Sequence, residues 1–210
     1  MGKVKLTRKK REKLRHKNEI LSAALRLFSG HGFHNVSMQQ IAEASEFAVG
    51  TLYNFFASKE ALFEELTKSC GERISKELVA ILDGPGTEVE RLSKFILHAP
   101  TLLEENAEIV RLYVSELGTR GAKISKNRDM DDFHVLLGTA LQKLIANGIR
   151  KGVFRKVDPK IATLAINSTI ETLAFENVGH FDKTAVTEMF DKVEQFFIDV
   201  LLLPEGKDDN

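Results

Sequence analysis

Residues 37–66 read SMQQIAEASEFAVGTLYNFFASKEALFEEL, and this stretch decides the fold. Ser37 and the glutamine three residues later form a capping box, which predicts the start of a short amphipathic helix. After a turn, apolar residues recur four positions apart at Leu52 and Phe56, which predicts a second short helix. Ser58 then has the position of an N-cap for a longer helix. Two short helices joined by a tight turn are the arrangement of a helix-turn-helix.

The outer face of the second predicted helix is polar. Thr51, Tyr53 and Asn54 lie opposite its apolar residues, and their side chains can hydrogen-bond both phosphate oxygens and base edges. Gly50 leaves room for a close approach of the backbone. Such a helix can lie in a DNA major groove. An ordinary helical hairpin has a similar pattern, so the residues alone leave both interpretations open.

The order IAEA, a turn, then VGTLYNFF and SKEALF closely resembles the DNA-binding domain of the TetR family of bacterial transcriptional regulators. That family has a TLY triplet, a following aromatic residue and a lysine at fixed spacing, as Thr51, Phe56 and Lys59 have here. Two positions depart from the pattern. Glu46 stands where the family's turn usually carries Gly, and we expect its charge to weaken general affinity for phosphates. Ala48 stands at the N-cap, where Ala costs about 1 kcal/mol relative to Ser.

The composition indicates a protein of one or two domains with no covalent framework. The 210 residues include one cysteine, Cys70, which excludes an intramolecular disulfide. We interpret Cys70 as a small buried hydrophobe rather than a redox sensor. No apolar run reaches the roughly 20 residues of a membrane span, and no signal-peptide core follows the basic N-terminus. We therefore expect a cytoplasmic protein with no membrane partner.

The charge is distributed unevenly along a chain with no net charge. Residues 1–60 contain 11 Lys or Arg against 5 Asp or Glu, and residues 61–210 contain 19 against 25. This asymmetry indicates a polyanion partner for the first part alone. Nine of the basic residues lie in an N-terminal arm, residues 1–17. We expect this arm to be a disordered tail without DNA, and to follow phosphates or enter a minor groove with it.

Helix start and stop signals continue to the end of the chain, without sustained period-2 alternation. A capping box at Thr87 predicts a helix that stops before Pro100, and Thr101 begins the next one. A long helix is predicted to end at about Lys151, with Gly152 as its C-cap. The predicted fold class is therefore all-α.

The stretch GIRKGVFRKVDPKIATLAINSTIETL is similar to the TetR family more loosely, since a turn ending in Gly, an aromatic residue and a D-P pair precede the family's eighth helix. The resemblance implies about nine helices in two domains. Residues 18–64 would form a three-helix helix-turn-helix domain, and residues 65–210 a ligand-sensing and dimerisation domain. The last two helices would form a four-helix bundle with their copies from a second subunit.

Small and apolar residues on the last two predicted helices support such a homodimer, because two successive stripes can bury more than one partner layer. A monomeric core is the alternative. A two-fold dimer places its recognition helices about one DNA turn apart and selects a palindromic operator. The predicted interface residues are Ile161, Leu164, Ala165, Ser168, Thr172, Met189, Val193, Phe196, Phe197 and Val200.

The resemblance also implies that a small apolar effector binds in a cavity among the middle helices. Candidate lining residues combine apolar walls with a few polar groups, as a ligand pocket requires. Each also fits a plain core position. The candidates are Phe95, His98, Leu102, Ile109, Tyr113, Phe133, Leu137 and Phe175.

The sequence contains no catalytic, phosphate-loop or zinc motif, so we expect no enzyme activity, no cofactor and no metal. Glu176, His180 and Asp182 lie close in sequence, but a solvated helix end explains them better than a metal site. Our hypothesis is a ligand-responsive repressor that binds double-stranded DNA. The alternative is a helical interaction module that binds nucleic acid non-specifically through its basic arm. The predicted DNA-binding residues are Ser37, Gln39, Val49, Gly50, Thr51, Tyr53, Asn54 and Lys59.

Overall fold

The computed structural model describes residues 7–112, 128–177 and 182–202. Every regular element in these residues is a helix, apart from one isolated bridge between Phe154 and Leu202. The predicted all-α fold is confirmed. The helices are α1 (Arg8–His31), α2 (Met38–Ala44), α3 (Val49–Phe55), α4 (Lys59–Leu82), α5 (Glu88–Glu105), α7 (Arg128–Arg150), α8 (Pro159–Asn177) and α9 (Lys183–Leu201), with a further helical stretch at 107–112.

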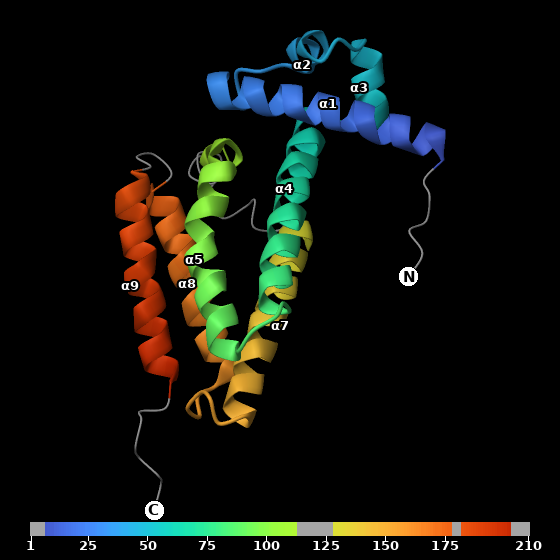
Figure 1. Ribbon diagram of the computed structural model, residues 1–210. Coiled ribbons are helices and arrows are strands. Elements are labelled where there is room, and N and C mark those ends of the chain that lie inside the picture. The colour runs from blue at the N-terminus through green and yellow to red at the C-terminus, as the bar shows by residue number, and fades with distance from the viewer. Residues whose placement is uncertain (1–6, 113–127, 178–181, 203–210) are drawn as a thin grey trace, which may run out of the picture.

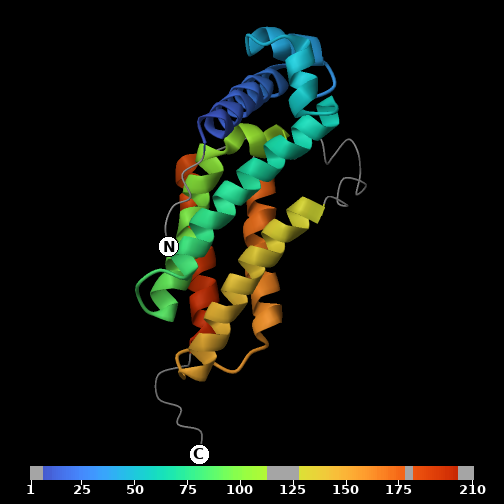
Figure 2. The same cartoon turned by 90° about the vertical axis from the view of Figure 1, so that its right-hand side faces the viewer.

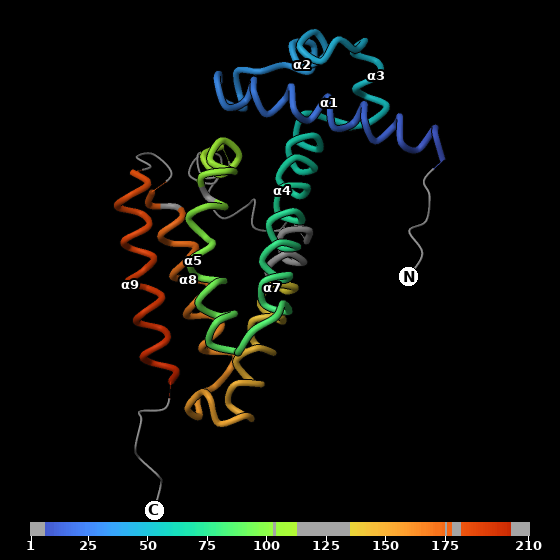
Figure 3. The backbone as a smooth tube through the Cα atoms, viewed as in Figure 1, coloured from blue at the N-terminus to red at the C-terminus, as the bar shows by residue number. Residues whose placement is uncertain are grey.

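Helices α1, α2 and α3 form a unit at one end of an elongated molecule (Figure 1). Helix α4 leaves this unit and runs along the remaining helices, packing against α5 and α7, while α5 packs against α9 (Figures 2 and 3). Since α4 is 24 residues long, it extends about 36 Å. It connects the two ends of the described molecule.

Two hydrophobic cores lie along α4. The first joins α1, α2 and α3 to the start of α4, and Ile20, Ile41 and Leu52 are fully buried in it. The second fills the space among α4, α5, α7, α8 and α9. Helix α4 contributes Leu66 to the first core and Leu82 to the second. The predicted domain boundary at residue 64 therefore lies within a continuous helix.

The helix ends follow the local signals of the sequence. Ser37 Oγ accepts from the Gln40 N–H at 3.2 Å, and Gln40 Oε1 accepts from the Ser37 N–H at 2.8 Å. Ser58 caps α4, and Thr87 begins α5 with a second reciprocal capping box. Gly152 has a φ of 70°, which suits the residue that follows a helix end. These caps are confirmed.

The expected disordered arm is wrong for residues 8–17, which form the first half of α1 with Thr7 as N-cap. Lys, Arg, Leu and Glu all favour helices. Ion pairs one turn apart, Arg8 with Glu12 and Arg15 with Glu19, add support. The segment extends a helix whose second half is already packed. Its residues therefore add turns to an existing helix and do not have to nucleate a new one.

The predicted stop before Pro100 is also wrong. Helix α5 continues through Pro100 to Glu105, and the break falls at Asn106. Ala99 and Leu102 are buried on either side of the proline, so core packing holds the helix where the local signal favours an end. The helix predicted to begin at Thr101 begins instead after Asn106.

Candidate nucleic-acid interface

The N-cap and first turn of α2, helix α3 and the start of α4 bring five of the eight predicted DNA-binding residues together. Ser37, Gln39, Val49, Tyr53 and Lys59 line one open hollow on the surface of the first unit. Gln39 is exposed, and its amide donates to Glu43 Oε1 at 3.1 Å. The hollow combines amide, phenol and hydroxyl groups with an apolar valine. These groups suit contact with both phosphates and base edges.

The remaining three predicted residues lie on α3. Gly50 and Asn54 are exposed, and Thr51 is half-buried. A Cβ built at Gly50 would meet no atom within 4 Å, so the space beside its backbone is open. Leu52 is fully buried on the opposite side, whereas Tyr53 is 53% exposed. Helix α3 therefore presents a polar face outward from a buried apolar one.

The turn between α2 and α3 has an unusual backbone. Glu46 has a φ of 60°, and it is the only described residue other than glycine with a positive φ. This left-handed conformation explains why a glycine suits that position. Ala48, the N-cap of α3, makes no side-chain capping bond. Phe47 packs against the ring of His16 at 5.0 Å between centroids, which ties the turn to α1.

Lys59 has a role that the sequence analysis missed. Its ammonium donates to the carbonyls of Phe33 and Val36, each at 2.8 Å, and lies 4.5 Å from the centre of the Phe33 ring. These bonds hold the segment that leads into the Ser37 cap. The structure therefore gives Lys59 a positioning role, and its contact with phosphate stays a prediction.

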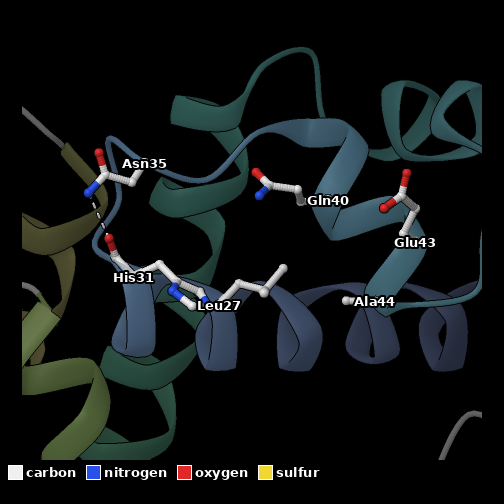
Figure 4. Close-up of a pocket in the computed structure, with 6 residues that line it drawn as sticks. All are labelled: Leu27, His31, Asn35, Gln40, Glu43 and Ala44. Carbon is white, nitrogen blue, oxygen red and sulfur yellow. Dashed lines mark hydrogen bonds between the residues drawn. The ribbon is translucent and has the colours of Figure 1, made fainter.

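Figure 4 shows another hollow, between the end of α1 and α2. Asn35 closes one side of it by donating to the carbonyl of His31 at 2.9 Å. None of the predicted DNA-binding residues lines this hollow. The hollow is lined by Leu27, His31, Asn35, Gln40, Glu43 and Ala44.

Within the part of the chain that the structure describes, no group of three or more His, Cys, Asp or Glu side chains could hold a metal ion.

The stretch 107–112 connects the second part of the chain to the first core. Ile109 and Leu112 are buried among the residues of α1, α2, α3 and α4. Ile109 was expected in the effector cavity, and its position in the first core separates it from the other candidates. The spacing of apolar residues in the sequence could not reveal this, because the same apolar helix face could pack in either core.

Asn106 lies at the start of this stretch and is buried. Its side-chain oxygen accepts hydrogen bonds from Arg73 and, at 3.4 Å, from Cys70, both on α4. Burial raises the pKa of the Cys70 thiol, and the neighbouring Arg73 opposes that shift. A raised pKa disfavours the reactive thiolate, which agrees with an inert cysteine.

Apart from Ile109, the candidate effector residues divide into three groups. Phe95, Leu102 and Leu137 are buried in the second core. His98 is half-buried between α5 and α4, with its Nε2 2.6 Å from Glu77 Oε1. Tyr113 lies outside the described residues, as do the side chains of Phe133 and Phe175. The effector cavity therefore stays a prediction.

Helices α8 and α9 carry an exposed apolar face. Ile161 and Leu164 on α8 are both 62% exposed, and Phe196 on α9 is 60% exposed. Phe197 was predicted at this surface, but it is buried in the second core against its exposed neighbour. Val193 is half-buried. The exposed predicted residues are Ile161, Leu164, Ala165, Ser168, Thr172, Met189, Phe196 and Val200.

Two family models match this chain. The model described as bacterial regulatory proteins, tetR family, matches residues 20–66, and the tetracyclin repressor-like C-terminal domain matches residues 85–195. Together with the fold, these matches define a helical regulatory protein with an N-terminal helix-turn-helix. The chain belongs to the TetR family. In the described part of the chain, no helix combines the length and apolarity that crossing a membrane requires.

The relatives of this chain include several HTH-type transcriptional regulators. YdgC of Bacillus subtilis is 30% identical over 100 residues, which cover 46% of this chain and 51% of YdgC. UidR of Escherichia coli (strain K12) is 42% identical over 57 residues, or 27% of this chain and 29% of UidR. The matched part thus spans about half of YdgC and less of UidR. HbdR of Aromatoleum sp. is 20% identical over 196 residues, which cover 93% of this chain and 84% of HbdR.

Solved structures have the same fold. A TetR-family transcriptional regulator from Syntrophomonas wolfei has a TM-score of 0.75 at 22% identity, covering 91% of this chain and 98% of its own. FadR from Bacillus subtilis, in complex with stearoyl-CoA, has a TM-score of 0.73 at 20% identity, covering 87% of this chain and 97% of its own. At these identities the likeness establishes the fold.

Proposed function

We propose that this protein is a ligand-responsive transcriptional repressor that binds a palindromic operator as a homodimer and is released by a small apolar effector. The observation that carries the proposal is the outward polar face of the helix-turn-helix, where Gln39 and Tyr53 lie exposed around one hollow. Family membership and the helix-turn-helix regulators among the relatives support it. The cell compartment that fits this function is the cytoplasm.

Each predicted DNA-binding residue has a role in this proposal. Tyr53, Ser37 and Lys59 hold phosphates and fix the register, which carries no sequence information by itself. Gln39, Thr51 and Asn54 contact base edges, and Val49 contacts a thymine methyl group. The open space at Gly50 lets the α3 backbone approach the groove. Glu46 is exposed in the turn, and its negative charge repels the phosphates.

The homodimer is formed by the exposed apolar face of α8 and α9. Large apolar side chains gathered on one surface are a mark of an interaction site. A two-fold axis through this face presents two copies of α3 to the same side of the DNA. The operator is then two inverted half-sites about one helical turn apart.

Effector release uses the connection between the two cores. FadR, a protein of the same fold, is described in complex with stearoyl-CoA, and the long acyl chain of that ligand supports an effector with an apolar part here. The stretch 107–112 belongs in sequence to the second part and packs in the first core, so a shift of α5 displaces groups beneath α1. Switching the protein from almost fully bound to almost fully free requires a preference of about 5.5 kcal/mol for one state.

Selection of operator sequences from random DNA tests this function. The full chain should enrich an inverted repeat, and candidate apolar effectors should release it. Tyr53→Ala should weaken binding to all sequences alike, whereas Gln39→Ala should reduce the preference at one base pair by about 1–3 kcal/mol. Unchanged operator affinity in both variants would overturn the proposed contacts of Tyr53 and Gln39 with DNA. The alternative, a non-specific interaction module, predicts that no repeat is enriched and that deletion of residues 1–17 alone abolishes binding.

A further inference from the structure

The first half of α1 has a concentration of positive charge that the helix-turn-helix roles do not use. Residues 8–17 contain seven Lys or Arg and one Glu. Arg8, Arg15 and Lys17 pair with glutamates. The other four cations, Lys9, Lys10, Arg11 and Lys13, form no ion pair with any described residue. All four are exposed.

Three contacts hold this basic half beside the recognition helix. The Lys13 ammonium lies 5.8 Å from the centre of the Phe55 ring, at the end of α3. His16 packs on Phe47 in the turn, and Lys17 Nζ lies 2.6 Å from Glu65 Oε1 on α4. In Figure 1, α1 continues past α3 toward the N-terminus. The four cations that form no ion pair among the described residues are therefore carried on a helix whose position relative to α3 is fixed.

From this geometry we propose that the first half of α1 is a second DNA-contacting surface, which binds the phosphates that flank each half-site. The proposal rests on the proposed function, because α3 must lie in a major groove. When it does, its end lies next to the backbone that bounds the groove, and the neighbouring helix meets that backbone. Ten helical residues extend about 15 Å, which is long enough to lie beside more than one phosphate of a strand.

The helical state of this segment decides how it binds. A helix is about 10 Å wide with side chains, whereas the minor groove is about 6 Å wide. Residues 8–17 therefore contact the outside of the DNA backbone. They do not enter the minor groove, as a flexible arm could. Lys9, Lys10 and Arg11 carry the contact, since Lys13 is engaged with Phe55. Contacts of this kind add affinity without sequence preference.

The test compares two triple variants of the full chain. The first is Lys9→Gln/Lys10→Gln/Arg11→Gln, in which glutamine keeps the helix propensity. The control, Lys76→Gln/Lys94→Gln/Lys156→Gln, removes the same charge from exposed residues of the second part. Operator affinity is measured by fluorescence anisotropy over a range of salt concentrations. Two DNA duplexes are used: the selected repeat with flanking sequence, and the same repeat trimmed to its half-sites.

On flanked DNA, the plot of log affinity against log salt should become less steep for the first triple variant, by about 0.9 for each phosphate that it no longer neutralises. Its base preferences should not change. Wild type on trimmed DNA should behave in the same way. The control should match wild type on both duplexes. Equal slopes for the two variants on flanked DNA would overturn the proposal. Failure of wild type to select any repeat would instead overturn the proposed function.

Discussion

At the scale of single residues, Lys59 decides whether the entry to the helix-turn-helix is held in place. Lys59→Met would remove the ammonium that donates to the carbonyls of Phe33 and Val36. A buried group that loses its partner costs about 1–3 kcal/mol, so we expect the free energy of unfolding in urea to fall by that amount. Lys76→Met, at an exposed position, should change it by less than about 0.5 kcal/mol. Equal stability of the two variants would mean that water replaces the ammonium.

Glu46 is the second residue with a testable backbone role. Its φ of 60° is unfavourable for any residue with a Cβ, by about 1 kcal/mol. Glu46→Gly should therefore raise the free energy of unfolding by up to about 1 kcal/mol. Glu46→Ala removes the same charge but keeps the Cβ, and it should leave stability unchanged. A gain in the alanine variant equal to that of the glycine variant would assign the effect to charge.

The site was predictable from sequence where its signals are local. The Ser37 cap and the outward face of α3 follow from residues within one or two turns of each other. The bonds of Lys59 and the packing of Phe47 on His16 join residues more than 20 positions apart. No single-sequence pattern identifies which distant carbonyl or ring a lysine or phenylalanine will meet. These tertiary contacts therefore required the structure.

At the scale of elements, the end of α7 depends on one close contact. The buried ring of Phe154 folds back over Gly148, and a Cβ built there would lie 2.2 Å from that ring. Gly148→Ala should lower the free energy of unfolding by about 1–3 kcal/mol, measured by chemical denaturation. In the background of Phe154→Ala the same change should cost nothing, because the clash is gone.

Gly138→Ala is the matched control on the same helix. A Cβ at Gly138 would meet Thr163 Cγ2 at 3.9 Å, an ordinary contact. Since alanine is the better helix former by about 1 kcal/mol, this variant should be as stable as wild type or more stable. Equal effects of the two glycine substitutions would contradict the proposed packing of Phe154.

The helices that sequence could predict are those whose ends are determined by caps. The capping boxes at Ser37 and Thr87 begin α2 and α5 as expected. Pro100 did not end α5, because buried neighbours outweigh the local preference. The helical state of residues 8–17 was missed because charge density favours disorder in an isolated tail but not in the extension of a packed helix.

At the scale of the whole molecule, the exposed face of α8 and α9 predicts the assembly. Ile161→Asp and Phe196→Asp each place a charge where we propose that two subunits meet. Each should raise the dimer dissociation constant by at least about 30-fold, equivalent to about 2 kcal/mol, as measured by analytical ultracentrifugation. Leu14→Asp alters an apolar residue that is 50% exposed on α1, and it should leave the dimer intact. A monomeric wild type, or dimers unaffected by both changes, would refute the interface.

The burial of Ile109 and Leu112 in the first core limits how the chain can be divided. A fragment that ends with α4 would lack these two side chains and would have an incomplete interior under α1. In a chimera that joins the helix-turn-helix part of one relative to the sensing part of another, residues 107–112 of the second protein would pack against the first core of the other. The two surfaces would not match. Modular exchange between such proteins therefore has to transfer the stretch 107–112 together with the N-terminal helices it completes.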